Sequence, residues 1–292
     1  MSDTSEPSNY VADAESPVEV ARLLRQDDLL TSAQDQIQEF LPSTLDRSSV
    51  EFALDVACGA GGWSRAVART LPGVQVIGFD LSEKMIEVAQ VRAKASRLTN
   101  VEFLRLDARD RPWPFPANHF DLVNARLIST FMTRELWPQL LAECFRIQRP
   151  GGVMRVIDME LQISNSLALE RLNHNFTISL HNLRRTFSET GRSMGIAPVL
   201  MPLLAHAGYT DIQQRGFTVD ASAGTPAHRD WFEDFKALHV SLSKLRGQHS
   251  QIDPDEVEAL YKQAHSDFLD KPDFTFILFL FMSWGRKREL ME

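Results

Sequence analysis

The sequence EFALDVACGAGGWS, from Glu51 to Ser64, predicts a β-strand that passes through a tight glycine turn into a helix. An apolar run carries an acid, Asp55, near its end, and three glycines follow within four positions, 59–62. Glycine accepts positive φ and has no side chain, so the backbone can bend sharply here and bring its N–H groups against a ligand. The following helix adds unpaired N–H groups and the positive end of its dipole. The stretch therefore predicts a site for a polar cofactor.

The glycine turn alone leaves two cofactor classes open. A dinucleotide fingerprint requires Gly-x-Gly-x-x-Gly, but counting from Gly59 places Ser64 where the third glycine would stand. The alternative pattern is an acid at the strand end followed by small residues at alternate positions, here Asp55, Ala57, Gly59 and Gly61. This second pattern resembles the first motif of the class I S-adenosylmethionine-dependent methyltransferases.

Composition and charge limit the classes of protein. The 292 residues are 43% hydrophobic and 24% charged, which is typical of an ordinary globular protein with one generous core. The net charge of −8 argues against a broad nucleic-acid footprint, which requires clustered Lys and Arg. The two cysteines, Cys58 and Cys144, cannot build a disulfide framework or a Cys-rich zinc site.

No targeting or membrane segment is expected. Residues 1–17 are polar and acidic, without the basic and apolar regions of a signal peptide. The most apolar run, residues 274–284, is shorter than the roughly 20 residues that a membrane-spanning helix needs. We therefore expect a cytoplasmic protein in which this run is a strand buried on both faces.

Strands and helices are expected to alternate after residue 50, and this rhythm predicts parallel βαβ units with right-handed crossovers. The expected strands are 51–57, 74–80, 101–106, 120–125, 153–159, 211–220 and 274–284. The expected helices are 62–71, 83–96, 134–147, 164–189, 197–206, 227–245 and 253–269. Residues 1–42 are expected to form a tail and one or two short capping helices, and residues 43–292 the main domain, with helical insertions at about 164–206 and 227–269.

Two acids at predicted strand ends indicate an adenosine site. Asp80 ends the second strand, where a carboxylate can accept both ribose hydroxyls of NAD or of S-adenosylmethionine. Asp107 ends the third strand and can accept a hydrogen bond from the adenine amino group, which a Rossmann dehydrogenase does not require. Leu81 and Met85 could supply apolar faces for the purine, although a methionine at helical spacing is often part of the core.

Several motifs in this order resemble class I methyltransferases of the ubiquinone/menaquinone-biosynthesis-like, small-molecule branch. They are the glycine loop, Phe79-Asp80, Leu106-Asp107-Ala108, the segment from Phe120 to Arg126, and Arg149-Pro150-Gly151-Gly152. The resemblance covers residues 51–159. It implies a Rossmann-like α/β fold, with a seven-stranded, mostly parallel sheet, a C-terminal antiparallel hairpin and a helical cap.

The resemblance also implies the cofactor, S-adenosyl-L-methionine, and its contacts. Asp55 would lie near the amino group of the methionine portion, and the backbone of residues 124–126 near the transferred methyl group. Ala57 stands where glycine is commonest, and a negative φ would accommodate it. The cofactor-binding residues so implied are Asp55, Ala57, Cys58, Gly59, Gly61, Asp80, Leu81, Met85, Asp107, Ala108, Asn124, Ala125 and Tyr10. Two further N-terminal candidates are Arg22 and Gln26.

The acceptor is predicted only as a class. Methyl transfer from a sulfonium is an in-line displacement, so much of the catalysis can come from alignment and exclusion of water. A base is needed only if the acceptor must lose a proton, and His174 and His181, seven apart on one helix face, are weak candidates. Asp158 and Glu160 could instead position an acceptor. A helical stripe favours core packing over a substrate cradle; it consists of Trp231, Phe232, Phe235 and Leu242.

The sequence thus predicts a methyltransferase that acts on an oxygen, carbon or nitrogen of a small molecule. The segment Asn124-Ala125-Arg126-Leu127 lacks the signature of enzymes that methylate base amines, so nucleic acid is not expected as a substrate. No metal spacing is found, and a homodimer is possible. The alternatives are an NAD-linked oxidoreductase and a non-catalytic protein that binds S-adenosylmethionine.

Overall fold

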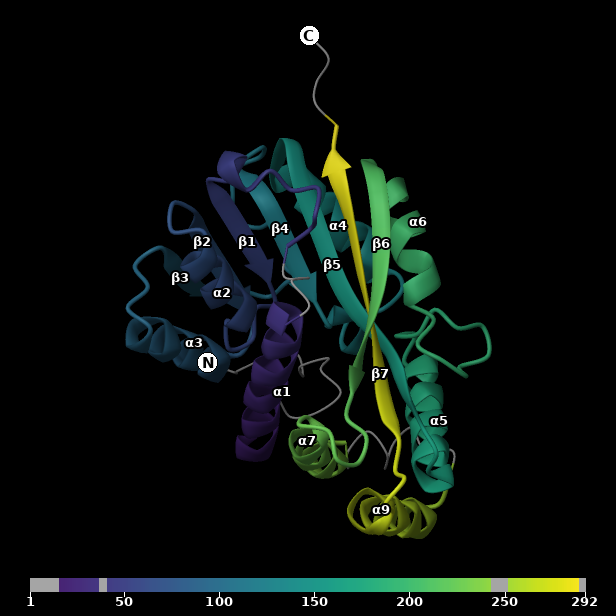
Figure 1. Cartoon of the computed structure of the whole chain (residues 1–292). Coiled ribbons are helices and arrows are strands. Elements are labelled where there is room, and N and C mark those ends of the chain that lie inside the picture. Colours follow the sequence, from purple (N-terminus) through teal and green to yellow (C-terminus); the bar gives the residue numbers. More distant parts are fainter. Residues whose placement is uncertain (1–15, 37–40, 243–251, 289–292) are drawn as a thin grey trace, which may run out of the picture.

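The computed structural model describes residues 16–36, 41–242 and 252–288. Seven strands form one sheet in the order β3-β2-β1-β4-β5-β7-β6 (Figure 1). The first five strands in this order are parallel, and β7 is antiparallel to both β5 and β6. The predicted fold class, with its C-terminal antiparallel hairpin, is therefore confirmed. The strands are β1 Phe52–Val56, β2 Gln75–Asp80, β3 Val101–Arg105, β4 Phe120–Arg126, β5 Gln148–Ser164, β6 Tyr209–Asp220 and β7 Phe276–Lys287.

Helices cover both faces of this sheet. Several begin at the capping residues that the sequence offers: the Ser82 hydroxyl accepts a hydrogen bond from the Met85 N–H, and the Ser166 hydroxyl accepts one from the Leu169 N–H. The α-helices are α1 Pro17–Gln36, α2 Gly62–Thr70, α3 Glu83–Ala95, α4 Leu136–Ile147, α5 Leu167–Asn182, α6 Ala197–His206, α7 His228–Ser241 and α9 Pro254–Asp270. Two short 3-10 helices are η1 Arg47–Ser49 and η2 Ile128–Thr130.

Successive side chains of the strands point to opposite faces of the sheet and so contribute to two hydrophobic cores, one on each face. On one face, Ala53 and Leu122 pack with Trp63 of α2. On the other face, Leu54 and Val123 pack with residues of α4 and α6. Both cores are needed because the parallel strands are buried on both sides.

A helical cap continues the first core beyond the parallel strands. β5 and β7 are 17 and 12 residues long, and Figure 1 shows them running down to α5, α7 and α9. Aromatic rings fill this part: the Phe268 ring centroid lies 4.3 Å from that of Phe274 and 5.2 Å from that of Phe235. Trp231, Phe232 and Leu242 are buried and Phe235 is half-buried, so the interpretation of this stripe as core is confirmed.

Several boundaries differ from those expected. β5 begins at Gln148, so the Arg149-Pro150-Gly151-Gly152 segment lies inside the strand, where the register with β4 shifts. One helix, α1, stands where one or two short ones were expected. β7 alternates buried and half-buried residues over 276–281, so its first half is not buried on both faces as predicted. Within the described ranges, no helix combines the length and apolarity needed to cross a bilayer.

Candidate active site

The glycine loop lies at the carboxyl edge of the sheet, between β1 and α2. Gly59 and Gly61 have φ of +53° and +72°, a region that favours glycine. Gly61 is also required for space, because a Cβ there would lie 2.6 Å from the Phe103 ring. The sequence prediction of strand, tight turn and helix is thus met in detail, and the loop presents its backbone at the edge where α/β sheets bind ligands.

Ala57 corrects one expectation. A negative φ was expected to accommodate alanine at this position, but its φ is +53°. A left-handed conformation costs an L-residue roughly 1–2 kcal/mol, because Cβ approaches the next carbonyl oxygen. The loop therefore holds strain at the position where the family resemblance implies glycine.

Asp80 anchors the glycine loop. One carboxylate oxygen accepts a hydrogen bond from the Gly59 N–H at 2.9 Å, and the other accepts one from the Ser82 N–H, also at 2.9 Å. A carboxylate has about four acceptor positions, so these two bonds are compatible with the predicted contact to ribose. The ribose role stays a prediction.

Asp107 lies two residues beyond the end of β3 and forms an ion pair with Arg109. Its carboxylate accepts hydrogen bonds from the Arg109 backbone N–H at 2.8 Å and from the guanidinium at 2.6 Å. Partial burial raises the pKa of Asp107, but the hydrogen bonds and charge of Arg109 outweigh it and hold the pKa below its usual value. An adenine amino group would share this carboxylate with Arg109. Of the predicted purine neighbours, Leu81 is 40% exposed and available for contact, whereas Met85 is buried.

A row of buried polar side chains crosses the sheet beneath the loop; we call Asp55, Asn124 and Arg155 the polar row. Asp55 accepts hydrogen bonds from the Ser64 hydroxyl at 2.6 Å and from the Asn124 amide at 2.7 Å. The Asn124 carbonyl accepts one from Arg155, whose guanidinium lies 5.8 Å from the Trp63 ring centroid. Burial raises the pKa of Asp55, against the effect of these bonds. The row thus joins three strands and α2.

Other predicted cofactor residues have clear positions. Cys58 and Ala108 are buried, as is Ala125, which packs in the second core. Burial raises the pKa of the Cys58 thiol well above its ordinary value, which fits a small filler beside the loop and not a nucleophile. Tyr10 lies outside the described residues.

Helix α1 lies against the loop and brings residues that sequence reasoning missed. Asp27 forms an ion pair with Arg126 at the end of β4, and a Cβ on Gly62 would lie 2.2 Å from an Asp27 carboxylate oxygen. Arg22, a predicted ligand contact, is buried and pairs with Glu19 and Asp234, so it fixes α1 to α7. No local sequence signal marks Asp27, because its partner is 99 residues away.

The two candidate catalytic histidines both lie on α5. His174 is exposed on α5. His181 is half-buried, and its Nδ1 lies 3.3 Å from the Thr186 hydroxyl and 3.4 Å from the Arg134 guanidinium. Neither histidine has a contact with the glycine loop among those described. Their catalytic role stays a prediction.

The two acids of β5 hold neighbouring segments. Asp158 accepts hydrogen bonds from the Ser129 hydroxyl at 2.6 Å and from its N–H at 3.0 Å, which fixes η2. Burial raises the pKa of Asp158 to about 6. Glu160 accepts bonds from the N–H groups of Gly195 and Ala197, both at 3.1 Å, and so caps the start of α6. Both carboxylates accept hydrogen bonds from the protein, so neither is wholly available to a ligand.

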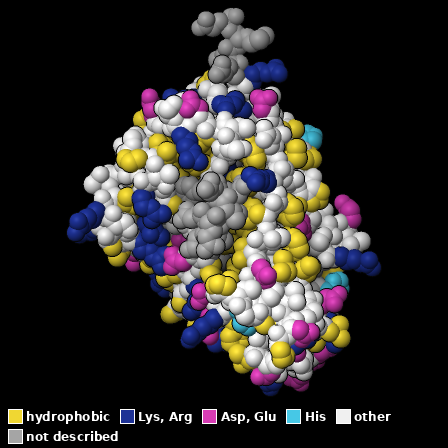
Figure 2. Space-filling model, viewed as in Figure 1, with side chains coloured by type: hydrophobic (Ala, Val, Ile, Leu, Met, Phe, Trp, Pro, Cys, Tyr) yellow, Lys and Arg dark blue, Asp and Glu magenta, His cyan; other side chains and the backbone are white. Residues whose placement is uncertain are grey.

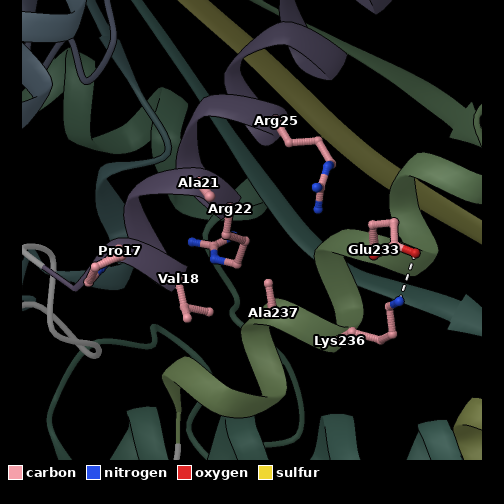
Figure 3. Close-up of a pocket in the computed structure, with 8 residues that line it drawn as sticks. All are labelled: Pro17, Val18, Ala21, Arg22, Arg25, Glu233, Lys236 and Ala237. Atoms are coloured by element: carbon pink, nitrogen blue, oxygen red, sulfur yellow. Dashed lines mark hydrogen bonds and ion pairs between the residues drawn. The ribbon is translucent and has the colours of Figure 1, made fainter.

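Two surface hollows lie away from the glycine loop. One, of about 370 Å³, lies between α1 and α7, where Arg25 and the Lys236–Glu233 ion pair face each other (Figure 3). The other, of about 310 Å³, is bordered by Thr44 and Trp284. Over the described ranges, no group of three or more His, Cys, Asp or Glu side chains is placed to hold a metal ion.

Comparisons with known proteins agree with this geometry. Residues 53–152 match the family described as a methyltransferase domain. The chain is 27% identical over 193 residues to a demethylmenaquinone methyltransferase of Geobacillus sp. (strain WCH70), covering 61% of this chain and 78% of that protein. It is 36% identical over 110 residues to the enzyme of the same name from Listeria welshimeri, covering 36% of this chain and 43% of that protein.

A solved structure supports the fold. A Bacillus halodurans C-125 protein, provisionally named a methyltransferase, has a TM-score of 0.53 and 18% identity, covering 88% of this chain and 98% of that one. At this identity the likeness concerns the fold alone. The NAD-linked alternative does not predict the C-terminal antiparallel hairpin that both the sequence and the sheet contain. The sheet order, the methyltransferase domain matched over residues 53–152 and the sequence likenesses together support a class I S-adenosylmethionine-dependent methyltransferase.

Proposed function

We propose that this enzyme methylates an oxygen, carbon or nitrogen of a small quinol-type or related aromatic molecule. The observation that carries the proposal is the combination of the glycine loop and its two strand-end acids with a helical cap built on β5 and β7. The likeness to demethylmenaquinone methyltransferases supports a quinol-type acceptor.

The residues at the sheet edge suit this cofactor. The glycine loop offers N–H groups without side chains in the way, Asp80 would hold the ribose hydroxyls, and Asp107 would accept from the adenine amino group. S-adenosylmethionine supplies a methyl group already activated by its sulfonium. The protein then has to orient an acceptor and exclude water, which the α1 and cap helices beside the edge would do.

The proposal assigns no general base. An acceptor that is acidic in its reduced form needs little help to lose its proton; His174 is exposed, and His181 has the contacts described above. If a base is used, pH–rate profiles of variants at these two positions would differ from the wild type.

The proposal also includes a cytoplasmic location and no nucleic-acid substrate. The net charge of −8 supports the second point, as does the face in Figure 2, where Lys and Arg are interspersed with Asp and Glu. A homodimer remains part of the proposal, and sedimentation at several protein concentrations would test it.

Turnover with labelled cofactor tests the function. The enzyme is incubated with S-adenosylmethionine carrying a radioactive methyl group and with reduced naphthoquinols, phenols and aliphatic amines. Label is expected in the naphthoquinol, and Asp80→Ala is expected to reduce it at low cofactor concentration. Glu83→Ala is the matched control, because this neighbouring carboxylate is 66% exposed and pairs with the surface Arg105.

Two outcomes would contradict the proposal in different ways. Calorimetric binding of NADH without any response to S-adenosylhomocysteine would remove the assigned cofactor. Binding of S-adenosylhomocysteine with transfer to amines, and none to naphthoquinols or phenols, would retain the enzyme class and overturn the acceptor class.

A further inference from the structure

We infer that Asp27 and Arg126 form a receptor for the charged methionine end of the cofactor, with Asp27 binding its ammonium group and Arg126 its carboxylate. This inference deepens the proposed use of the sheet edge and rests on it. The two residues come from α1 and from the last position of β4. The sequence did not lead us to expect a ligand contact from either side chain.

The two side chains meet over the carboxyl edge. Arg126 donates one hydrogen bond to an Asp27 carboxylate oxygen and another, of 3.3 Å, to the hydroxyl of Thr31, one turn further along α1. The side chains are only 11% and 7% exposed. This is a largely desolvated pair, whose partners matter far more than those of a surface ion pair.

Asp27 lies directly at the glycine loop. Its carboxylate occupies the space that a side chain on Gly62 would need, since a Cβ there would lie 2.2 and 2.4 Å from its two oxygens. Gly62 is the first residue of α2 and follows the left-handed Gly61. The carboxylate is therefore held where the loop turns into the helix, which is the place expected for the methionine portion.

One Asp27 carboxylate oxygen lacks a hydrogen-bond donor among the described residues. Oδ2 is buried and has no hydrogen-bond partner among the residues that the structure describes. A buried carboxylate oxygen without a donor is unfavourable, because it loses its hydration without compensation. An ammonium group of a ligand supplies such a donor with a matching charge.

The charges also balance. Asp27 and Arg126 carry one charge of each sign, as do the ammonium and carboxylate of the cofactor. Exchanging the internal pair for two ligand pairs leaves no uncompensated buried charge. Asp55, the other nearby acid, already accepts hydrogen bonds from Ser64 and Asn124, so Asp27 is the better placed partner for the ammonium group.

Calorimetric titration of the full chain with two ligands tests the inference. S-adenosylhomocysteine carries the amino-acid end, whereas 5′-methylthioadenosine has the same adenosine and thioether without it. Asp27→Asn and Arg126→Gln are each expected to weaken S-adenosylhomocysteine binding by about tenfold or more, from the loss of a charged hydrogen bond. Binding of 5′-methylthioadenosine should stay within about twofold in both, which also shows that the variants fold.

A third ligand assigns the two roles. Decarboxylated S-adenosylhomocysteine keeps the amine and lacks the carboxylate. Its binding should be weakened by Asp27→Asn and not by Arg126→Gln. The reverse order of sensitivity would overturn the assignment.

Asp28→Asn is the matched control. Asp28 is the next residue of α1 and pairs with Arg92 of α3 at 2.8 Å, so its loss loosens α1 without touching the proposed receptor. It should leave both affinities unchanged. Equal losses for both ligands in Asp27→Asn and Asp28→Asn would mean that the pair only docks α1. Unchanged S-adenosylhomocysteine affinity in Asp27→Asn and Arg126→Gln would also overturn the inference, whereas a wild-type chain that binds neither ligand would overturn the proposed function itself.

Discussion

The Asn124 side-chain amide donates a 2.7 Å hydrogen bond to the Asp55 carboxylate, and the two residues are register partners in the parallel pair of β4 and β1. Arg155 is in turn the register partner of Asn124 on β5, and Trp284 that of Arg155 on β7. The polar row therefore follows one line across β1, β4 and β5, and Trp284 continues this line on β7.

Removal of the central member of the polar row should strongly destabilise the fold. Asn124→Ala removes one hydrogen-bond partner from each of the buried Asp55 and Arg155, and we expect a loss of about 2–4 kcal/mol in the free energy of unfolding. Urea unfolding measures it. Gln263→Ala is the control, because it removes an exposed hydrogen bond to Asp267 and should change stability by less than about 0.5 kcal/mol. A loss no larger than that of the control would show that the row carries little of the stability.

Glycine at position 57 should be tolerated or favoured. Ala57→Gly relieves the left-handed conformation, while the added freedom of the unfolded chain offsets part of the gain. We expect stability to be unchanged or to rise by up to about 1 kcal/mol. Ala53→Gly, in the buried centre of β1, should instead lose about 1 kcal/mol. Equal losses in the two variants would argue against strain at Ala57.

Asp80→Ala should weaken cofactor binding. The variant loses the predicted ribose acceptor and the bond that holds the Gly59 N–H, so we expect a loss on the order of 1–3 kcal/mol in the binding of S-adenosylhomocysteine. Calorimetry gives the affinity, and Glu83→Ala should keep the wild-type value. An unchanged affinity in Asp80→Ala would place the ribose elsewhere.

Asp158 should make stability depend on pH. Its folded pKa of about 6 lies above its ordinary value of 3.8, so the folded state binds more protons between these values. The stabilising contribution is full below about pH 4 and is lost as the pH rises through 6. Relative to Asp158→Asn, the wild type should therefore lose about 1–3 kcal/mol between pH 4 and 7.5.

Unfolding in urea at several pH values measures this difference. The hydrogen bonds that asparagine cannot make to Ser129 lower stability by an amount that does not vary with pH, so the slope isolates the ionisation. The control is Asp270→Asn, a change at the surface, and its free energy of unfolding should vary with pH in parallel with that of the wild type. If the stability of Asp158→Asn changed with pH in parallel with that of the wild type, the pKa of Asp158 would not be raised.

The sequence was sufficient for the sheet and the glycine loop, because both depend on local patterns. Gly59 and Gly61 are where the backbone needs positive φ, and the apolar spacing of 62–70 follows directly into α2. The mostly parallel sheet with its C-terminal antiparallel hairpin followed from the resemblance and from the rules for parallel units.

Long-range pairs could not be predicted in the same way. Asp27 and Arg126, or Arg155 and Met282, lie far apart in the chain, and no local pattern says that they meet. The positive φ of Ala57 was missed for another reason: alanine normally avoids that region, and only the packing of the surrounding loop imposes it. The start of β5 at Gln148 was missed because a proline and two glycines signal a turn, whereas here they lie at a register shift.

The long β5 and β7 strands separate the part of the sheet beneath the glycine loop from the part beneath the cap. Arg155 belongs to the polar row, and Ser164, nine residues along the same strand and so about 30 Å away, pairs with Phe276 beneath the cap. Mutations that remodel the cap can therefore accumulate without altering the strand register beneath the glycine loop. Descendants of one ancestral gene could exchange the molecule they recognise while inheriting the same methyl donor.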